Sequence, residues 1–409
     1  MNRSLIQRVA VMAIIFSLIA TGIYLLFFAD PYRFRSEPVF EPAKTDLPKT
    51  ALKERQPIQS TLCRDALPEE LLSAYDTIDE YAHYSGSESF WLENITKDEF
   101  RAAYEAYTRD HPEVFWLSSD SAFSYYQMDT SLEVELSFSH SGDALDAAKQ
   151  IFNESLSKAF TYAPDNADDL ETEVFINDYL VSHCEYDPDA EMCHNAYGAL
   201  VGGKAVCDGY AHAFQLLCNK AGIACSVIEG TSDFNEDKDT GHMWNCVQVG
   251  SDWYNADVTW NDINKTQFFC ERYFYLNIDD KEIKTDHRFS PMYNGNNEGE
   301  YNLFVPECKT KKLRYLDICC PVIDDINKDD DMIGALINTA RQKDRSCSFV
   351  IGDSLPYNDT CNSIINDGYI NSWIDGANHY TDNNHQIGMQ TKAYTYKNKN
   401  VLTVELSYE

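Results

Sequence analysis

The dipeptide Gly250-Ser251 constrains the fold of this chain more than any other short segment, because it separates two strand-like aromatic stretches. Residues Gly241–Val249 and Asp252–Trp260 are both rich in aromatic and β-branched side chains. A two-residue connection that contains glycine is typical of the tight turn in a β-hairpin. The sequence therefore predicts an antiparallel hairpin whose register is set by this turn.

The predicted register brings His242 and Asp257 to one face of the sheet. A two-residue turn pairs Val249 with Asp252, and counting outward from that pair sets Asp257 opposite Trp244. His242 is two residues from Trp244 and lies on the same face, at a diagonal separation of about 7–8 Å from Asp257. A slip of one residue would move Asp257 to the other face. We expect a hydrogen bond between the His242 imidazole and the Asp257 carboxylate.

Cys207 lies where a glycine pair precedes a predicted helix. Gly202-Gly203 allow a sharp turn, and Gly222 is placed to end the helix. The apolar face of this helix has helical spacing and consists of Tyr210, Ala213, Phe214, Leu217 and Ala221. In the first turn, unpaired N–H groups and the helix dipole favour a thiolate over a thiol. Taken alone, the same position also suits a small buried cysteine.

Together, Cys207, His242 and Asp257 form a candidate catalytic triad. Cys207 is the candidate nucleophile, and its own N–H is a candidate hydrogen-bond donor to the oxyanion. His242 would act first as a general base and then as a general acid. Asp257 would fix the imidazole tautomer and stabilise the imidazolium.

The segment from about 172 to 262 resembles the transglutaminase-like superfamily, a papain-related fold. The matching motifs are Gly-x-x-x-Cys-x-Gly-Tyr-Ala at 203–211, Ala221-Gly222-Ile223, His242-x-Trp244-Asn245 and Trp253-Tyr254-x-x-Asp257-x-Thr259-Trp260. The order Cys, His, Asp also agrees with that family. The resemblance implies an α+β fold with a papain-like, transglutaminase-like core, in which a nucleophile helix packs on an antiparallel sheet. It also implies acyl transfer from a glutamine side chain or peptide bond to an amine or water.

The regions that flank this segment do not resemble animal transglutaminases. This difference puts the calcium dependence and the crosslinking role of those enzymes in doubt for this chain. The flanks look more like the accessory domains of a membrane-tethered microbial member.

The N-terminus has the pattern of a membrane anchor. Arg3 and Arg8 precede an uncharged run of 21 residues, Val9–Ala29, which would span roughly 31 Å as a helix. We expect a single-pass membrane protein with an extracytoplasmic catalytic region. The alternatives are a signal peptide cleaved near Ala20-Thr21-Gly22, which would leave a secreted protein, and a buried core helix.

Composition and patterning divide the 409 residues into five regions. We predict a cytoplasmic tip and transmembrane signal-anchor at 1–30, a linker rich in Pro, Lys and Glu at 31–60, an N-terminal accessory α+β region at 61–160, the catalytic core at 161–290 and a C-terminal accessory α/β region at 291–409. In the accessory regions we predict helices at 68–84, 96–110 and 332–341 and a strand at 401–408. Thr96 and Glu99 fit a capping box.

Charge and cysteine content limit the partners and the compartment. The net charge of -33 would repel a phosphate backbone, so we expect no nucleic-acid partner. The chain has 13 cysteines, so in an oxidising compartment twelve could pair and one would remain. Cys184 and Cys193 are close enough in sequence to pair, whereas the adjacent Cys319-Cys320 cannot form an unstrained bridge. The sequence does not decide whether any disulfide forms.

Two other clusters invite a metal interpretation. The spacing of His183, Cys184, Cys193 and His194 fits no common zinc motif, so we interpret them as structural cysteines and surface histidines, with a metal site as the alternative. The run Asp233, Asn235, Asp237 and Asp239 mimics the start of a calcium loop. However, Lys238 and Trp244 stand where glycine and glutamate are needed. We interpret this run as a solvated acidic loop that could gate the cleft.

For several remaining residues we expect structural roles. Trp244, Trp253 and Trp260 are expected to pack the sheet rather than to contact substrate. Cys218, Cys225 and Cys246 fall on core-facing positions. The family pattern suggests that Tyr186 and Asp187 lie near the cleft.

We therefore predict a transglutaminase-like cysteine acyltransferase or hydrolase that forms a thioester on Cys207. Its substrates would be proteins or peptides outside the membrane, and we expect neither a cofactor nor a metal. Hydrolysis and transamidation share every step up to the thioester, so the triad does not distinguish them. The alternatives are an extracytoplasmic cysteine peptidase of envelope peptides and a catalytically silent surface binding module.

Overall fold

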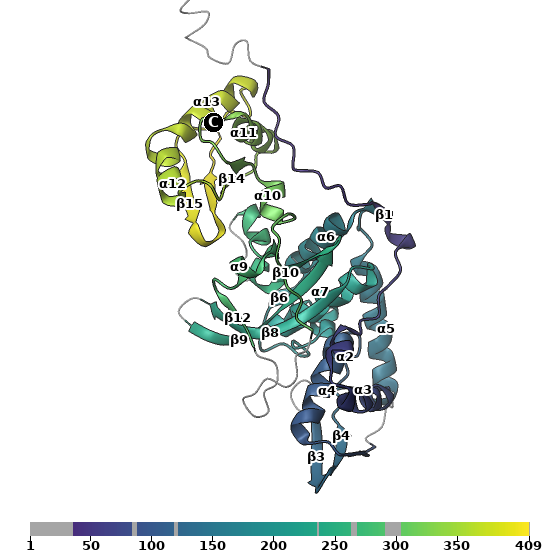
Figure 1. Cartoon of the computed structure of the whole chain (residues 1–409). Coiled ribbons are helices and arrows are strands. Elements are labelled where there is room, and N and C mark those ends of the chain that lie inside the picture. Colours follow the sequence, from purple (N-terminus) through teal and green to yellow (C-terminus); the bar gives the residue numbers. More distant parts are fainter. Residues whose placement is uncertain are drawn as a thin grey trace, which may run out of the picture. The chain divides into compact units, whose positions relative to one another are not determined.

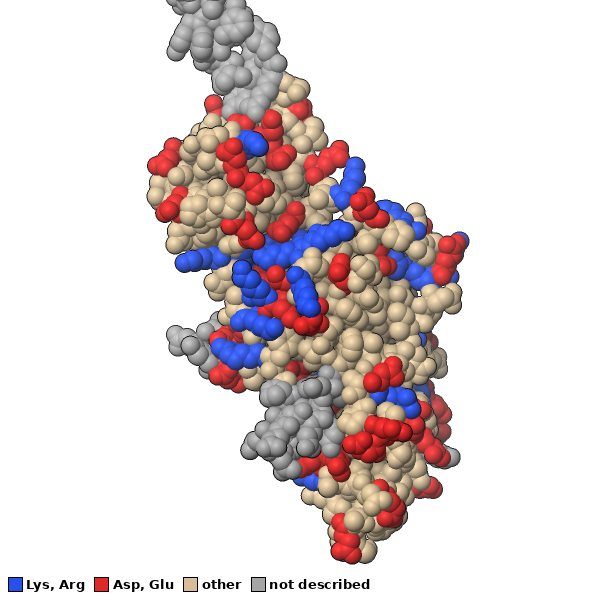
Figure 2. Space-filling view, in the orientation of Figure 1, with Lys and Arg blue, Asp and Glu red and all other residues tan. Residues whose placement is uncertain are grey.

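The computed structural model describes residues 36–83, 88–117, 122–234, 237–262, 268–290 and 304–408. These residues form two compact units (Figure 1). The larger unit is Ala43–Cys319, and the smaller unit combines the residues from Cys320 onward with the described stretch up to Pro42. The region limits predicted at 60, 160 and 290 stay predictions. Acidic side chains are spread over the visible face of each unit, as the net charge of -33 requires (Figure 2).

A five-stranded sheet forms the centre of the larger unit. Its strand order is β11-β10-β9-β8-β12, and every neighbouring pair is antiparallel. The strands are β8 (Cys225–Phe234), β9 (Asp237–Val249), β10 (Asp252–Ala256), β11 (Leu276–Ile278) and β12 (His287–Phe289). Helices α6 (Asp169–His183) and α7 (Cys207–Lys220) lie beside this sheet (Figure 1). This mixture of helices with an antiparallel sheet confirms the α+β class predicted for the core.

The β9–β10 hairpin has the register that its turn predicts. Val249 pairs with Asp252, and the ladder continues to Asn245 opposite Ala256. Gly250 adopts a positive φ of 64°, a conformation that glycine tolerates far better than other residues. The turn therefore fixes which residues of β9 and β10 face one another.

Helix α7 is held against the sheet by buried side chains and two amide contacts. Tyr210, Phe214 and Leu217 are at most 1% exposed. Asn245 donates from Nδ2 to the Ala211 carbonyl at 3.0 Å, and Gln215 donates from Nε2 to the Cys225 carbonyl at 3.2 Å. These contacts tie α7 to β9 and β8, and so fix the helix start relative to the strands.

The first part of the larger unit is a helical layer with a small sheet. The helices are α2 (Leu62–Ala66), α3 (Glu69–Ala82), α4 (Lys97–Asp110) and α5 (Gly142–Ala159). The strands β2 (Phe90–Glu93), β4 (Ser131–Leu136) and β3 (Phe123–Met128) pair in that order. The predicted capping box is confirmed, because Thr96 Oγ1 accepts the Glu99 N–H at 3.3 Å and Glu99 Oε2 accepts the Thr96 N–H at 2.6 Å.

Short elements connect these layers. They are β1 (Thr50–Ala51), η1 (Leu52–Glu54), β5 (Asn166–Ala167), β6 (Glu185–Tyr186), η2 (Gly198–Gly202), β7 (Lys204–Ala205), α8 (Val258–Asp262), η3 (Phe269–Tyr273), α9 (Asp280–Ile283) and α10 (Tyr315–Cys319).

The smaller unit packs helices on a four-stranded sheet. Its strand order is β13-β14-β16-β15, with a core that contains Phe349, Trp373 and Ile374. The elements are β13 (Val322–Ile323), α11 (Asp330–Gln342), β14 (Ser346–Ile351), α12 (Tyr357–Asn366), α13 (Tyr369–Tyr380), β15 (Lys392–Tyr396), η4 (Lys397–Lys399) and β16 (Val401–Glu405). The helix predicted at 332–341 is confirmed as α11, while the predicted strand at 401–408 ends at Glu405.

No helix among the described residues is long and apolar enough to cross a membrane. The predicted anchor at Val9–Ala29 lies outside the described residues.

The hairpin of β8 and β9 contains two glycines that differ in their surroundings, which gives a test of the packing. A Cβ added at Gly230 would lie 2.0 Å from the Arg288 carbonyl oxygen and 2.8 Å from the Trp244 ring. Gly230→Ala should therefore lower the free energy of unfolding by roughly 1–3 kcal/mol, because β12 and Trp244 must shift.

The matched control is Gly241→Ala, since a Cβ at Gly241 meets nothing within 4 Å. It should change the free energy of unfolding by no more than about 0.5 kcal/mol in the same urea titration. Equal effects of the two substitutions would contradict the packing described for β8 and β12.

Candidate active site

The candidate nucleophile stands at the first residue of α7. Val206 before it is extended, with φ −105° and ψ −174°, and Cys207 begins the helix. The short helix η2 ends at Gly203, which has a φ of 66° and turns the chain toward Cys207. Cys207 is partly exposed, so its thiol is at the start of a helix and within reach of solvent. The structure thus places Cys207 in the first helical turn, as predicted.

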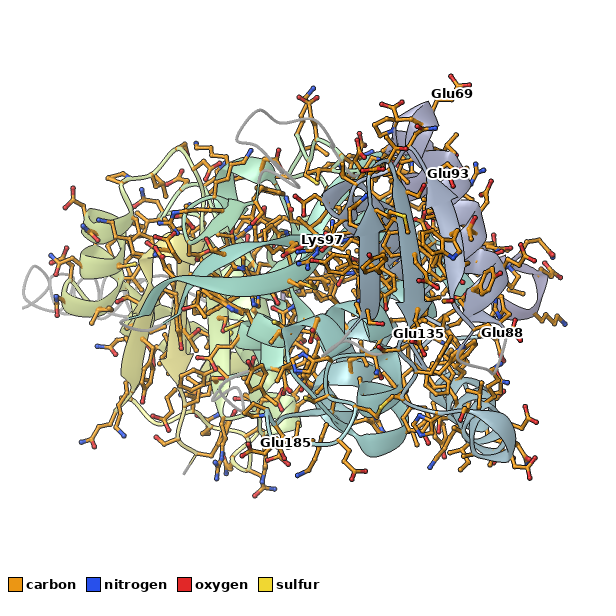
Figure 3. All side chains as sticks on the ribbon, turned by 90° about the horizontal axis from the view of Figure 1, so that it is seen from below. Glu69, Glu88, Glu93, Lys97, Glu135 and Glu185 are labelled. Carbon is orange, nitrogen blue, oxygen red and sulfur yellow. The ribbon has the colours of Figure 1, made fainter. Side chains whose placement is uncertain are left out.

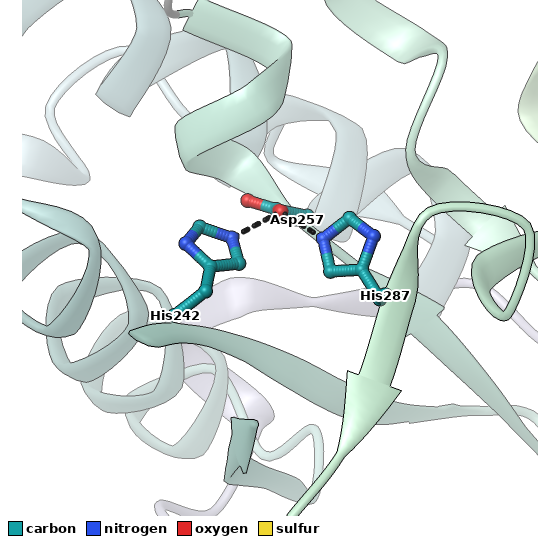
Figure 4. A group of neighbouring side chains, drawn as sticks. All are labelled: His242, Asp257 and His287. Carbon is teal, nitrogen blue, oxygen red and sulfur yellow. Dashed lines mark hydrogen bonds and ion pairs between the residues drawn. The ribbon is translucent and has the colours of Figure 1, made fainter. Parts of the chain in front are cut away.

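His242 and Asp257 form the hydrogen bond that the hairpin predicts. The distance from His242 Nε2 to Asp257 Oδ2 is 2.7 Å (Figure 4). His242 comes from β9, and its partner Asp257 directly follows β10. Asp257 is fully buried and His242 is 7% exposed. The pair is therefore largely shielded from water, which strengthens its electrostatic interaction.

The position of Asp257 differs from the prediction in one respect. The strand predicted at 252–260 ends at Ala256, and Val258–Asp262 form helix α8. Asp257 Oδ1 accepts the Trp260 N–H at 3.0 Å, which is the contact of a residue that caps a helix start. Asp257 therefore does not pair opposite Trp244, and it reaches His242 from the end of the strand.

The third contact of the triad joins Cys207 to His242. The Cys207 side chain lies close enough to His242 to contribute, after burial and Asp257, to the shifted pKa of the imidazole, which it helps to raise. Because His242 Nε2 faces Asp257, its Nδ1 is the ring nitrogen left for Cys207. The three predicted residues are thus brought together in the order thiol, imidazole, carboxylate. Their catalytic roles stay predictions.

The carboxylate controls the protonation of the imidazole. Burial lowers the pKa of His242, but the charge and hydrogen bond of Asp257, together with the contact to Cys207, raise it to about 9. Burial raises the pKa of Asp257, yet its interactions with His242 and His287 outweigh burial and hold this pKa below its usual value. At neutral pH the pair therefore consists of an imidazolium and a carboxylate.

A second histidine, His287, was not identified from the sequence. His287 Nε2 lies 3.0 Å from Asp257 Oδ2, the same oxygen that His242 contacts (Figure 4). His287 opens β12, which pairs with β8 through Ser232. This strand is only three residues long and its partner lies 55 positions earlier, so no local pattern marks it. In the sequence, the acidic neighbour Asp286 is the feature that could have pointed to His287.

Aromatic rings enclose the two histidines. The His287 ring lies 5.1 Å from Trp244, 4.6 Å from Trp260 and 5.6 Å from Tyr275, measured between centroids. Trp244 is 1% exposed and donates from Nε1 to Asn255 Oδ1 at 3.2 Å. Trp244 therefore packs the sheet, as expected.

His242, Asp257 and His287 are also a possible donor set for a metal ion. Among the described residues they are the group whose ligand atoms all lie within 4.8 Å of one another. However, both Nε2 atoms point at one carboxylate oxygen at hydrogen-bond distance. The two nitrogens that would bind the ion thus already donate hydrogen bonds to the oxygen that would bind it. The arrangement fits proton transfer better than metal binding.

The other Cys/His cluster is dispersed. His183 Nδ1 contacts the Tyr179 carbonyl at 2.8 Å, and His194 Nδ1 contacts Asp208 Oδ2 at 2.8 Å. The thiols of Cys184 and Cys193 point at different carbonyl oxygens. These four residues do not form a metal-ligand group within the described part of the chain.

The acidic run differs from the predicted solvated loop. Its described residues extend β8 and β9 rather than forming an open loop. Asp233 accepts two hydrogen bonds from Arg288, both at 2.9 Å. Strand pairing and this ion pair hold the run against β12.

Tyr186 lies near the triad, while Asp187 forms a surface ion pair. The charge of Cys207 contributes to the raised pKa of Tyr186, after the larger contribution of burial. Asp187 binds Lys204 Nζ at 2.7 Å. Tyr186 is thus the better placed of the two to meet a substrate.

Comparison with known proteins finds a family match in the central region of the chain. The model of the transglutaminase-like superfamily matches residues 155–258. The kyphoscoliosis peptidases of Mus musculus and Homo sapiens are both 30% identical over 26% of this chain and 19% of their own length. The chain thus spans about a fifth of the curated relatives that it matches. A crystal structure of a TGase aligns over 47% of this chain and 57% of that chain, with 12% identity and a TM-score of 0.26. The segment that matches the transglutaminase-like superfamily, residues 155–258, contains Cys207, His242 and Asp257.

Proposed function

We propose that this chain is a cysteine-dependent acyltransferase or amide hydrolase of transglutaminase-like type. The observation that carries the proposal is the buried His242–Asp257 pair, with the partly exposed Cys207 at a helix start and close enough to contribute to the raised pKa of His242. Thiol, imidazole and carboxylate in this order supply a nucleophile, a proton acceptor and an orienting group. The substrates would be proteins or peptides, outside the membrane if Val9–Ala29 is the anchor that the sequence predicts.

The reaction would proceed through a thioester. Cys207 Sγ attacks the carbonyl carbon of an amide, and its proton resides on His242. His242 then gives that proton to the departing nitrogen, so that ammonia or an amine leaves and the acyl group stays on sulfur. Water or a second amine attacks the thioester, His242 accepts its proton, the C–S bond breaks, and the Cys207 thiolate is restored beside the imidazolium. The N–H of Cys207, in the first helical turn, is positioned to stabilise the oxyanion.

A cavity next to the first turns of α7 is a candidate site for the acyl donor. Its volume is about 480 Å³, and its lining includes Asp208 and Met243, the neighbours of Cys207 and His242 in the sequence. The opposite wall comes from α4 and β3, including Lys97, Tyr104, Phe123 and Tyr125. Lys97 Nζ lies 5.3 Å from the centroid of the Tyr125 ring, and Figure 3 shows Lys97 beside the strands of the small sheet. A lining that combines aromatic rings with Lys97, Arg101, Glu105 and Asp208 suits a polar peptide segment.

Hydrolysis of a peptide bond is the second candidate. The matched relatives are named peptidases, which supports attack of water on the thioester. The two outcomes differ in whether water or an amine reaches the acyl group. Incubation with a glutamine-containing peptide and a labelled amine separates them, because release of ammonia without incorporation of the label contradicts transamidation.

The nucleophile is tested by its reactivity. Cys207 should react with iodoacetamide at neutral pH at least about tenfold faster than Cys319, because Cys207 interacts with His242, whose raised pKa makes it positively charged at that pH. Cys319 is the matched control, since it is also partly exposed. Peptide mass analysis after brief labelling measures both sites. Similar labelling of the two, or faster labelling of buried Cys218, would rule out Cys207 as the nucleophile.

Asp257→Asn tests the orienting carboxylate. It should lower kcat by roughly 10³–10⁴-fold, because the asparagine neither stabilises the imidazolium nor enforces its tautomer. In the unchanged protein, activity should fall as pH rises through about 9, where His242 loses its proton. In the variant that alkaline limb should move to lower pH.

The control is Asp233→Asn, which removes a surface ion pair with Arg288 in the same sheet. It should leave kcat within about twofold, because exposed ion pairs contribute little. If Asp257→Asn retained full activity with an unchanged pH profile, the triad would be wrong.

Tyr125→Ala tests the cavity. Removal of this ring should raise the KM for peptide donors about tenfold, which corresponds to about 1.4 kcal/mol of lost contact. Tyr126→Ala is the control, because Tyr126 is its neighbour on β3, is also exposed, and does not line the cavity. The rate of Cys207 alkylation by iodoacetamide should not change in either variant. An equal rise of KM in both would place the donor site elsewhere.

A further inference from the structure

The second histidine has two acidic partners and no exposure to solvent. His287 is 0% exposed. Its Nε2 lies 3.0 Å from Asp257 Oδ2, and its Nδ1 lies 2.7 Å from Asp286 Oδ1. Asp286 also accepts a hydrogen bond from the Tyr275 hydroxyl, at 2.6 Å to Oδ2. A continuous series of contacts therefore runs from Tyr275 through Asp286, His287 and Asp257 to His242.

Counting protons along this series fixes the state of His287. An ionised carboxylate only accepts hydrogen bonds, so both Nε2 atoms that face Asp257 must carry a proton. The other nitrogen of His287 faces the Asp286 carboxylate, and it must also donate. A histidine that donates from both nitrogens is an imidazolium. The direction of its pKa shift agrees: burial lowers the pKa of His287, but the contacts with Asp257 and Asp286 outweigh burial and raise it.

We infer that His287 is a positioning residue, a buried imidazolium that fixes the Asp257 carboxylate and limits how strongly Asp257 holds the proton on His242. The inference rests on the proposed function of Cys207 and His242. The centroids of the two imidazole rings are 5.2 Å apart. Two positive charges at such a separation disfavour each other, so the charge on His287 lowers the pKa of His242 relative to Asp257 acting alone.

This opposition serves the first half of the reaction, in which the thioester forms. His242 must release its proton to the departing nitrogen, and a proton held too tightly by a buried carboxylate slows that step. His287 would keep Asp257 ionised and in one orientation, while it moderates the basicity of His242. Asp257 thus orients the His242 ring, while the charge on His287 helps His242 to release its proton. A single carboxylate without His287 would perform both tasks less well.

The remaining charged groups near this series are accounted for. Cys207 faces His242 from α7, and the rings of Trp244 and Trp260 around both histidines are uncharged. Glu282 on α9 is bound by Arg314 through two hydrogen bonds, at 2.9 and 3.1 Å. Arg288, next to His287 in the chain, is exposed and binds Asp233. The charge that faces His287 most directly is thus that of Asp257 and Asp286.

Nitrogen NMR of protein labelled with ¹⁵N-histidine tests the inference without turnover. The chain has 10 histidines, so single substitutions can assign the signals. At pH 7, both ring nitrogens of His287 should be protonated. In His287→Gln, the amide keeps an N–H donor for Asp257 but carries no charge. The titration midpoint of His242 should therefore rise by about one pH unit, and the alkaline limb of kcat/KM should move with it.

Two controls keep the test decisive. His183→Gln changes an exposed histidine outside the site and should leave the His242 midpoint unchanged. Asp286→Asn removes the second acidic partner, so His287 should lose its proton at a lower pH than in the unchanged protein. This variant reports on His287 itself if His287→Gln does not fold.

A His287 ring with one unprotonated nitrogen at pH 7 would overturn the inference. A His242 midpoint that stays constant or falls in His287→Gln would overturn it too. If the midpoint rises as expected but the protein transfers no acyl group, the role of His287 stands and the proposed function fails. A purely structural role would lower the yield of folded protein without moving this midpoint.

Discussion

The Asp257 carboxylate is the interaction on which the site depends. It is fully buried, and it accepts hydrogen bonds from two imidazoles and from the Trp260 amide. These partners come from β9, β12 and α8, so one ionised group joins three elements that are distant in sequence. Removing a partner from a buried charge typically costs about 3–5 kcal/mol. The carboxylate therefore holds the site together while it sets the charge of His242.

The sheet supplies the frame in which this carboxylate can act. The tight turn at Gly250-Ser251 sets the register of β9 and β10, and Asp257 follows directly where that ladder ends. Its exit into α8 lets one carboxylate oxygen cap the helix while the other meets the histidines. Helix α7 then brings Cys207 to the remaining nitrogen of His242. Cys207 lies at a helix start and His242 lies on a strand, so the geometry of the site depends little on loops.

Burial gives these groups their distinct properties. Two buried thiols, Cys218 and Cys246, have pKa values raised well above the ordinary range, chiefly by desolvation. Cys246 Sγ lies 3.7 Å from Cys308 Sγ, within a core that also contains Trp244. Such thiols are unreactive because the charged form is costly in an apolar environment. Cys207 differs from them in its partial exposure and in its histidine partner.

The sequence by itself determined the parts of the site that local rules control. Turn chemistry gave the hairpin register, helical spacing gave α7 with Cys207 at its start, and the motifs indicated the family. The end of β10 at Ala256 could not be predicted, because Asp257 gains more by capping α8 and binding two histidines than by continuing a ladder. Only the tertiary structure placed His287, since a three-residue strand takes its position from pairing with β8 rather than from its own pattern. The state of His287 likewise depends on Asp257 and Asp286 together, and a charge that exists only between two buried partners is visible only once the chain has folded.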